Sequence, residues 1–388
     1  MSTIEQTNQH IMPTYARNEV VIVEGHGATC YDADGKKYID FGSGIGTTSL
    51  GYCSDAWADA VCAQVRKVQH TSNLFYHQPQ AEFAEKLCRM SGYEKLFFGN
   101  SGAEANECAI KIARKYSFDK YGKGRSTIIT LVNSFHGRTL TTLSATGQDV
   151  FHQYFFPFTE GFRFVKANDI ADLHDKLDDT VCAIMIEYVQ GEGGVMALDS
   201  EFVQEIRRVC DERDILMIAD EVQTGIGRTG KLFAGEHYGC KADVTTSAKG
   251  LGGGLPIGVC LANHKCADVL NLGAHGSTFG GNPVVCAGGI KVLETLETPG
   301  MLDGILEKSS YLREKLSGLQ EVKEVSGIGL MIGIALKQKK AADVLKACIR
   351  EGLLVLTAKD RVRLLPPLTI TMEELQAGAE ILCRVIES

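Results

Sequence analysis

One lysine, a few charged side chains and two loops of small residues are the parts of this sequence whose types and spacing could do chemistry. Lys249 follows Thr246–Ala248 and precedes the glycine-rich run Gly250–Gly254. Glycines let a ligand approach a lysine closely, and a lysine desolvated near another cation loses its proton easily and becomes a nucleophile. A flexible surface loop or a nucleotide-phosphate loop would also explain Lys249 alone, but here the glycines follow the lysine, which is the reverse of the P-loop order.

Two loops of small residues could hold a phosphate. Gly99–Ala103 lies between a predicted strand and a predicted helix, so backbone N–H groups and the positive end of the helix dipole would face an anion there. His275–Pro283 is a second such loop, in which Thr278 could donate a hydrogen bond. Each loop also has a plainer interpretation, because a helix N-cap or a simple connector needs the same residue types.

Three further side chains suit a flat, charged ligand. Asp220 ends an apolar run and could hydrogen-bond a protonated ring nitrogen, His136 could stack on a ring, and Arg138 could grip a carboxylate with two N–H groups. A helix cap, a core histidine and a salt-bridged arginine explain each of them singly. All of these candidates nevertheless follow predicted strands, and ligands bind beyond the carboxyl ends of strands in such sheets. The combination therefore predicts one shared site.

Short apolar runs separated by helical patterns predict the elements that position these residues. The predicted strands are Leu96–Phe98, Thr127–Leu131, Cys182–Ile186, Ile215–Ala219, Asp243–Thr246 and Gly258–Leu261. Helical patterns such as Ala103–Tyr121 and Glu201–Glu212 lie between them. Strands that alternate with helices predict an α/β fold with a parallel sheet covered on both faces.

The two ends of the chain have a different pattern. Near the N-terminus, Val20–Val23 and Thr29–Asp32 are predicted strands, and Asp34-Gly35 is a hairpin signal. A long helix is predicted over Pro283–Leu296, and short helices then alternate with strands. The strands expected in this last part are Leu330–Ile334 and Leu353–Leu356. We expect an N-terminal segment (1–50) that packs with the small domain, a large ligand-binding domain (51–297) and a smaller α+β domain (298–388).

Composition narrows the class of protein. With 388 residues, of which 44% are hydrophobic and 23% charged, the chain is typical of a globular protein of two or three domains. A net charge of −8 disfavours nucleic-acid and anionic-membrane partners. The 13 cysteines contain no C-x-x-C pair, which favours reduced thiols in a cytoplasmic protein over a disulfide framework or a metal site. Met1–Met12 lacks an apolar signal, and no run of about 18 apolar residues predicts a membrane span.

In their order, these pieces resemble the class III, or omega-type, aminotransferases of pyridoxal 5′-phosphate (PLP) fold type I over nearly the whole chain. The strongest stretch is Ile218–Gly230, followed at the family's distance by Lys249. Within the class, Met12–Arg17, Phe97–Glu107, Gln190–Gly194 and Arg363–Leu368 are similar to motifs of the acetylornithine aminotransferases. The chain departs from the pattern at Gly51–Asp55, at Thr47-Thr48 and at Tyr188, which replaces proline. We expect these departures to lie at the pocket rim and the dimer face.

The resemblance implies PLP as cofactor, a mostly parallel seven-stranded sheet in the large domain, and a homodimer with shared active sites. It also implies transfer of the terminal amino group of N2-acetylornithine to 2-oxoglutarate, giving N-acetylglutamate 5-semialdehyde and glutamate, in arginine biosynthesis. Ornithine, succinylornithine and 4-aminobutyrate stay open as donors on the same scaffold. Racemisation or decarboxylation with PLP and, remotely, a non-catalytic nucleotide-binding module are further alternatives.

Residue roles follow from the same resemblance. Lys249 would carry the cofactor as a Schiff base and, once freed, act as general base, while Asp220 would keep the pyridine nitrogen protonated. The residues expected to hold the cofactor are Ser101, Gly102, Ala103, Phe135, His136, Asp220, Gln223 and Lys249, with Thr278 of the second subunit. The residues expected to bind substrate are Tyr15, Arg138, Glu187, Glu192, Ser277 and Arg363. Our hypothesis is that Glu192 neutralises Arg363 with one substrate and releases it for the α-carboxylate of the other, while Arg138 binds the distal carboxylate of both.

Overall fold

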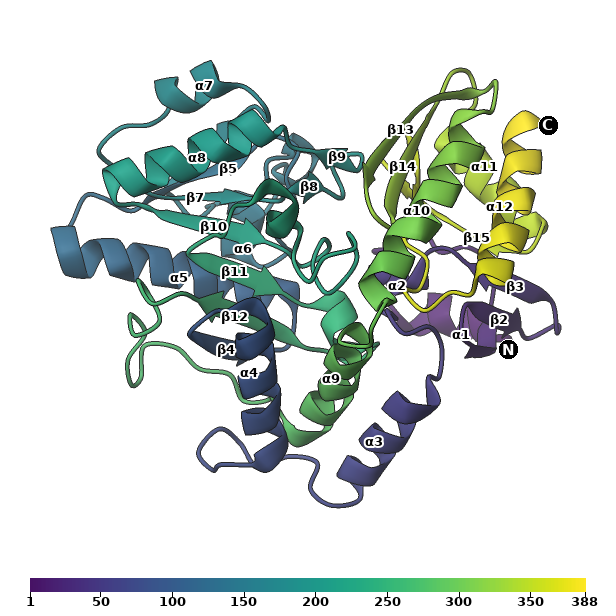
Figure 1. Cartoon of the computed structure of the whole chain (residues 1–388), viewed down its shortest axis with the longest axis horizontal. Helices are drawn as coiled ribbons and strands as arrows, with labels where there is room; N and C mark the ends of the chain where they lie inside the picture. The colour runs from purple at the N-terminus through teal and green to yellow at the C-terminus, as the bar shows by residue number, and fades with distance from the viewer.

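The structure is a computed structural model that describes residues 1–388. Its centre is a seven-stranded sheet (Figure 1). In spatial order the strands are β4 (Lys95–Gly99), β12 (Gly258–Ala262), β11 (Val244–Ser247), β10 (Leu216–Asp220), β7 (Val181–Ile186), β5 (Thr127–Leu131) and β6 (Phe162–Val165). The five strands from β11 to β6 pair in parallel, and β12 alone runs antiparallel to its neighbours. The predicted α/β fold with a mostly parallel seven-stranded sheet is confirmed.

Helices cover both faces of this sheet, as Figure 1 shows for α5 and α8. The helices of this part are α3 (Asp55–Val65), α4 (Gln78–Ser91), α5 (Gly102–Tyr121), α6 (Leu140–Ala145), α7 (Ile170–Asp175), α8 (Ser200–Arg213) and α9 (Pro283–Leu296). Along β10, Met217 and Ala219 pack with the apolar side of α8, whereas Leu216 and Ile218 pack with that of α5. Because side chains alternate along a strand, Asp220 at the end of β10 lies on the α5 side.

The chain after α9 forms an antiparallel sheet covered by helices. Its strands, in spatial order, are β13 (Val322–Ile328), β14 (Met331–Leu336), β17 (Arg361–Leu364) and β16 (Leu356–Ala358). Its helices are α10 (Met301–Ser317), α11 (Ala341–Arg350) and α12 (Met372–Glu387). The strand predicted over Leu353–Leu356 divides at Val355, so that β15 (Leu353–Leu354) joins a different sheet from β16.

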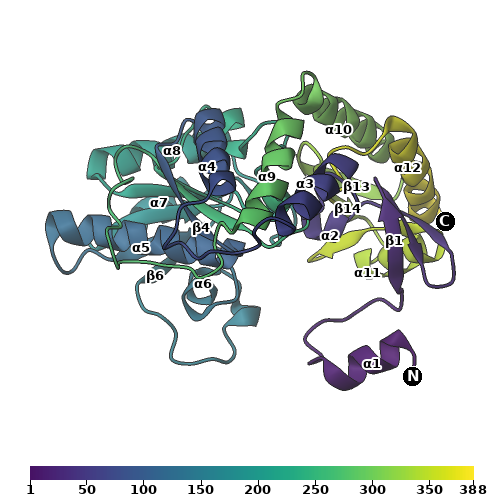
Figure 2. The same ribbon diagram turned by 90° about the horizontal axis from the view of Figure 1, so that it is seen from below.

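The N-terminal strands lie against this last part of the chain. They are β1 (Ile22–His26), β2 (Thr29–Asp32) and β3 (Lys37–Asp40), and β3 pairs in parallel with β15. This pairing fits an N-terminal segment packed on the C-terminal part, although the boundaries at 50 and 297 stay predictions. The short elements are α1 (Thr3–His10), α2 (Ser43–Gly46), β8 (Val189–Gln190), β9 (Met196–Ala197) and the 3₁₀ turns η1 (Asp149–Phe151), η2 (Ala234–Tyr238) and η3 (Lys249–Gly252). Helix α1 buries no residue and stands off the body of the chain in Figure 2.

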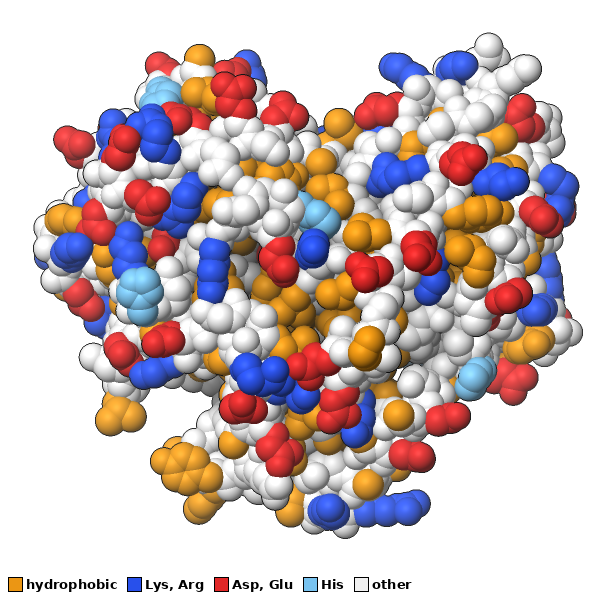
Figure 3. All heavy atoms as spheres, viewed as in Figure 1, with side chains coloured by type: hydrophobic (Ala, Val, Ile, Leu, Met, Phe, Trp, Pro, Cys, Tyr) orange, Lys and Arg blue, Asp and Glu red, His pale blue; other side chains and the backbone are white.

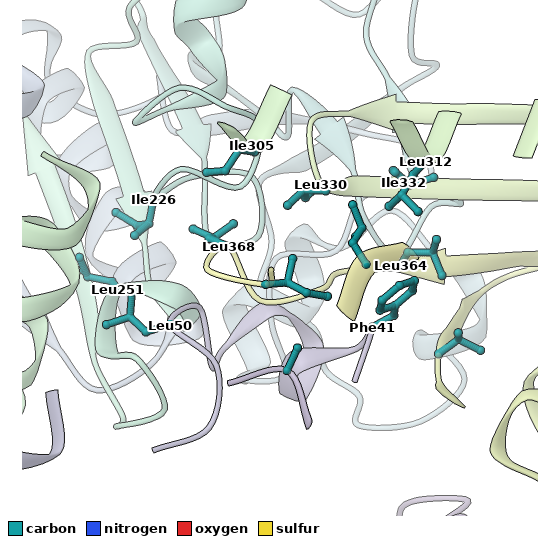
Figure 4. Packing of buried hydrophobic residues seen from close by; sticks show 14 of the residues in the cluster. Phe41, Leu50, Ile226, Leu251, Ile305, Leu312, Leu330, Ile332, Leu364 and Leu368 are labelled. Atoms are coloured by element: carbon teal, nitrogen blue, oxygen red, sulfur yellow. The ribbon is translucent and has the colours of Figure 1, made fainter. Parts of the chain in front are cut away.

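One apolar core joins the large sheet's flank to the C-terminal part. Figure 4 shows Phe41 beside Leu364, and Ile226 beside Leu251 and Leu368, all within one buried cluster. Burial of such side chains contributes roughly 1.5–3 kcal/mol each, so the two parts are held in one arrangement. Acidic and basic side chains are interspersed over the face in Figure 3, without a broad patch of one sign. None of the helices combines the length and the apolar composition needed to cross a membrane.

Candidate active site

A cavity of about 450 Å³ opens where the carboxyl ends of β5, β7, β10 and β11 meet the N-terminus of α5. This volume suits a small ligand. Eleven of the predicted site residues line it: Ser101, Gly102, Ala103, Phe135, His136, Arg138, Glu187, Glu192, Asp220, Gln223 and Lys249. The fold therefore gathers these residues from positions up to about 150 apart in the sequence, because parallel strands present their carboxyl ends at one edge.

Lys249 begins η3, separated from the end of β11 by one residue, and has a φ of 45°, a conformation that non-glycine residues seldom adopt. Such backbone costs of order 1–3 kcal/mol and persists where the surroundings hold it. Burial lowers the pKa of the Lys249 ammonium below its ordinary value, although the carboxylates of Glu192 and Asp220 oppose this shift. A lysine that gives up its proton more easily is a better nucleophile and base.

Asp220 is buried and held by three donors. Its Oδ2 accepts from His136 Nδ1 and from Asn106 Nδ2, both at 2.8 Å, and its Oδ1 accepts from the Val222 N–H at 3.0 Å. The hydrogen bond places the His136 proton on Nδ1. Burial opposes a charge on His136, but Asp220 outweighs it and raises the pKa of the imidazole. His136 Nε2 is buried and has no partner in the chain, which leaves it for a ligand.

The first turn of α5 forms an anion cradle. Ser101 is the N-cap, and its Oγ accepts from the Glu104 N–H at 3.2 Å. The N–H groups of Gly102 and Ala103 lack an intrahelical acceptor, as at any helix start, and both residues line the cavity. A Cβ on Gly102 would lie 2.7 Å from Val222 Cγ1, so only glycine fits between the helix and the strand end.

Two glutamates line the cavity in different electrostatic states. Glu187 accepts from the Phe135 N–H at 2.9 Å and from the Gly191 N–H at 3.3 Å, and burial raises its pKa to about 7. Glu192 is also penalised by burial, but Arg363 beside it outweighs this effect and lowers the pKa of Glu192. Glu192 therefore stays ionised at neutral pH, whereas Glu187 takes up a proton more readily than an ordinary glutamate.

Arg363 and Glu192 form the pair that the sequence predicts. Arg363 Nη1 lies 2.5 Å from Glu192 Oε1 and 3.2 Å from Gln223 Oε1, while Gln223 Nε2 lies 3.4 Å from Glu192 Oε1. Arg363 comes from β17 and is buried, and its Nε has no hydrogen-bond partner in the chain. The C-terminal sheet thus places one cation against the edge of the cavity.

Arg138 is held differently. Its guanidinium carbon lies 4.0 Å from the centre of the Phe151 ring and 5.4 Å from that of Phe135. It is exposed, lines the cavity and makes no ion pair. Arg138 is therefore a cation at the cavity whose N–H groups are available to an anion.

Four predicted site residues do not line this cavity. Arg363 contacts it through Glu192 and Gln223, which do line it. Tyr15 is 75% exposed and lies near Arg17, in the segment that follows α1. Ser277 and Thr278 line a separate hollow, where the Ser277 hydroxyl accepts from Asn100 Nδ2 at 3.1 Å. Their predicted roles would need either movement or a second copy of the chain.

The departures from the family pattern also lie in different surroundings. Thr47 lines the cavity, as expected of a pocket-rim residue. Tyr188 does not: it is buried, stacks on Tyr238 with ring centres 5.1 Å apart, and reaches the Cys240 carbonyl at 3.3 Å. The expectation that the departures lie at the pocket rim and the dimer face is wrong for Tyr188, because its side chain is buried in the core beside α8.

Sequence reasoning missed Asn106 as a site residue. Its amide N donates to Asp220 and to the His136 carbonyl at 2.7 Å, and its amide O accepts from Thr246 Oγ1 at 2.7 Å. The available signal was a buried amide in the second turn of a helix whose neighbours Ala105 and Ala109 are apolar. A buried amide of this kind needs several partners, which a strand end can provide.

Comparison with known proteins decides the family. The sequence profile described as Aminotransferase class-III matches residues 11–386. The chain belongs to the class-III aminotransferases. It is 52% identical over 379 residues to the acetylornithine aminotransferase of Haemophilus ducreyi, covering 97% of this chain and 96% of that protein. It is 42% identical to the succinylornithine transaminase of Citrobacter koseri, covering 97% and 95% of the two chains.

The fold of this aminotransferase matches that of an ornithine aminotransferase from Toxoplasma gondii. The TM-score is 0.94 at 31% identity, covering 99% of this chain and 94% of the other. A second structure of the T. gondii protein has PLP partially occupying its active site. PLP is the cofactor of the class, and the residues of this aminotransferase fit it: an anion cradle at α5, a buried carboxylate for the ring nitrogen, and a lysine whose pKa is lowered.

Proposed function

We propose that this aminotransferase moves the terminal amino group of N2-acetylornithine to 2-oxoglutarate, giving N-acetylglutamate 5-semialdehyde and glutamate, as in arginine biosynthesis. The observation that carries the proposal is the pair of arginines at this site. Arg138 lines the cavity and is free, and Arg363 is neutralised by Glu192 at the cavity's edge. Acetylornithine presents one carboxylate, far from its reacting amine. Glutamate presents two, one of them beside its amine. One permanent and one switchable cation suit these two substrates in turn.

The cofactor, when bound, supplies an electron sink for the carbon that carries the amine. We assign its phosphate to the N-terminus of α5 and its ring nitrogen to Asp220, which three donors keep in place. Lys249 Nζ would hold the cofactor and, once freed, would serve as the base that takes the proton from the amine-bearing carbon and as the acid that gives it back. His136 and Asn106 both fix the orientation of Asp220, to which each donates at 2.8 Å.

Substrate binding follows from the two arginines. The Arg138 guanidinium, with its N–H groups free, binds the carboxylate distant from the reacting amine in both substrates. While acetylornithine is bound, the Glu192 carboxylate keeps Arg363 neutralised. When glutamate binds, Glu192 releases Arg363 to its α-carboxylate.

Ornithine, succinylornithine and 4-aminobutyrate are the competing donors. The relatives include enzymes named for acetylornithine and for succinylornithine, and the chain's higher identity is with the former. Steady-state kcat/KM for the four amines, each with 2-oxoglutarate as acceptor, tests the proposal. Acetylornithine should have the highest kcat/KM, and a clear preference for another donor would contradict the assignment.

We further propose that the active unit is a homodimer in the cytoplasm. The hollow that holds Ser277 and Thr278 is lined by the strongly exposed apolar side chains of Leu74, Tyr76 and Leu272. Phe75 and Phe279, which adjoin lining residues in the sequence, are exposed as well. Exposed apolar clusters of this kind mark protein interfaces. All 13 cysteines are unpaired, which suits a reducing compartment.

A subunit-mixing experiment tests the shared site. Lys249→Ala and Thr278→Arg subunits should each be inactive alone. If Thr278 of one subunit completes the phosphate site of the other, random mixing restores one intact site in each mixed dimer, or roughly a quarter of wild-type activity. No recovery in a mixture shown by sedimentation to exchange subunits would contradict the shared site.

A further inference from the structure

Arg138 makes neither an ion pair nor a hydrogen bond within the chain, yet its guanidinium has a defined place. It lies over the Phe151 ring at 4.0 Å, well within the range of a cation–π contact, and less closely over Phe135. The carboxylates of the cavity are engaged elsewhere, since Glu192 pairs with Arg363 and Glu187 accepts from two backbone N–H groups. Phe151 is therefore the closest cation–π partner of Arg138.

This way of holding a cation has a consequence for ligand binding. A carboxylate partner would use the N–H groups of the guanidinium, as Glu192 does with Arg363. An aromatic face attracts the guanidinium through the ring quadrupole and leaves its N–H fork free. Arg138 is thus fixed in place while it keeps the donors that a substrate carboxylate needs.

Phe151 lies in a turn that hydrogen bonds hold in place. It ends η1, where its N–H donates to the Gln148 carbonyl at 3.0 Å, and Gln148 Nε2 donates to the Ser134 carbonyl at 3.0 Å. His152, the next residue, bonds the Leu143 carbonyl at 2.8 Å. The Phe151 ring also meets the edge of Phe135 with centres 5.9 Å apart. The ring does not line the cavity, so Phe151 acts on the substrate through the two lining residues that it contacts, Arg138 and Phe135.

We infer that Phe151 is a positioning residue that keeps Arg138 permanently available to the distal carboxylate shared by the two substrates. The inference rests on the proposed function, in which Arg138 binds that carboxylate. The two arginines then differ in the group that holds each of them in place. A carboxylate makes Arg363 switchable, and an aromatic ring makes Arg138 constant.

Binding of glutarate to the holoenzyme tests this inference, because glutarate is a dicarboxylate that cannot react. Phe151→Leu should weaken glutarate binding by about 3- to 30-fold, the size of a partly desolvated cation–π contact. Phe151→Tyr keeps the ring and should stay within about twofold of wild type. Phe158→Leu is the matched control, since Phe158 packs on His152 and Phe156 in the same loop, and it should not change binding.

A double-mutant cycle separates positioning from a merely structural role. In an Arg138→Gln background, Phe151→Leu should alter glutarate binding by less than about twofold, because the cation that it positions is gone. An equal loss in both backgrounds, or no loss in the wild-type background, would overturn the inference. Because glutarate binding needs no turnover, absence of amino transfer from acetylornithine would count against the proposed function alone.

Discussion

Glu192 and Arg363 illustrate how a single ion pair can decide between substrates. The pair is short and largely removed from water, so loss of one partner leaves the other charge exposed to any ligand nearby. Glu192→Gln should leave Arg363 free at all times, which favours the glutamate half-reaction over the acetylornithine half-reaction. We expect the ratio of the two single-turnover kcat/KM values to shift by about tenfold.

The matched control for this change is Glu205→Gln on α8. Glu205 also pairs with an arginine, Arg208, but it lies outside the cavity. This variant should keep the wild-type ratio. An unchanged ratio in Glu192→Gln would reject the switch, because Arg363 would then be equally available in both half-reactions.

At the scale of one element, helix α5 has two functions in the site. Its N-terminus forms the anion cradle, and its Asn106 holds Asp220 in place by a hydrogen bond. Asn106 lies one turn after Ser101 and joins Asp220, the His136 carbonyl and Thr246. Asn106→Ala removes one donor from Asp220 and leaves Thr246 Oγ1 without its acceptor. We expect kcat to fall by about tenfold or more, because networks of this kind act as a unit.

A spectroscopic measurement accompanies this kinetic one. In Asn106→Ala, the pH dependence of the visible absorbance of the bound cofactor should shift, because the charge facing its ring nitrogen is less well fixed. Asn263→Ala is a control, as this amide donates to Asp243 outside the cavity. A wild-type kcat together with a wild-type titration curve in Asn106→Ala would show that Asn106 is not part of the site.

The strands that the sequence predicts well are those buried along all or nearly all of their length. β5, β7 and β10 lie in the middle of the sheet between two helical layers, so their apolar runs are nearly continuous. β6 escaped prediction because it is a short edge strand, half-buried over Phe162–Phe164, with Arg163 in its middle. Leu353–Leu356 is one apolar run, and only the neighbouring strands show that it serves two sheets.

The candidate site was predictable wherever its residues follow strands, as Asp220 and Lys249 do. Asn106 was not, because its role depends on which helix face meets the end of β10, and this is set by the packing of the whole layer. Tyr188 shows the opposite kind of error, in which a residue expected near the site lies away from it. Its replacement of proline suggested a place at the pocket rim or the dimer face, but its ring packs in the core beside Tyr238.

At the scale of the whole molecule, the buried carboxyl of Glu221 makes stability depend on pH. It accepts from Thr224 Oγ1 and from the Ala234 and Gly235 N–H groups, and burial raises its pKa to about 7. In the unfolded chain this carboxyl ionises near its ordinary value of 4.5. The folded state therefore binds more protons between these two values, and its stability falls as the pH rises from about 4.5 to about 7.

Urea unfolding of wild type and Glu221→Gln at pH 5 and pH 7.5 checks this effect. The wild type should lose on the order of 3 kcal/mol of its free energy of unfolding between pH 5 and pH 7.5 because Glu221 ionises. The glutamine cannot ionise, so the variant should not show this loss. The variant is expected to be less stable than wild type at pH 5, because an amide accepts fewer of the three hydrogen bonds. An identical pH dependence in the two proteins would contradict the assignment of this loss to Glu221.

The central claim is that Lys249, in the turn just after β11, carries the cofactor. Borohydride reduction of the holoenzyme fixes the cofactor to the amine that bears it, and peptide mass spectrometry then locates it. The predicted result is one pyridoxyl group per chain on the peptide that contains Lys249, and none on a Lys249→Arg protein treated in the same way. A pyridoxyl group on another lysine, or a Lys249→Arg protein that transfers amino groups at the wild-type rate, would contradict the claim.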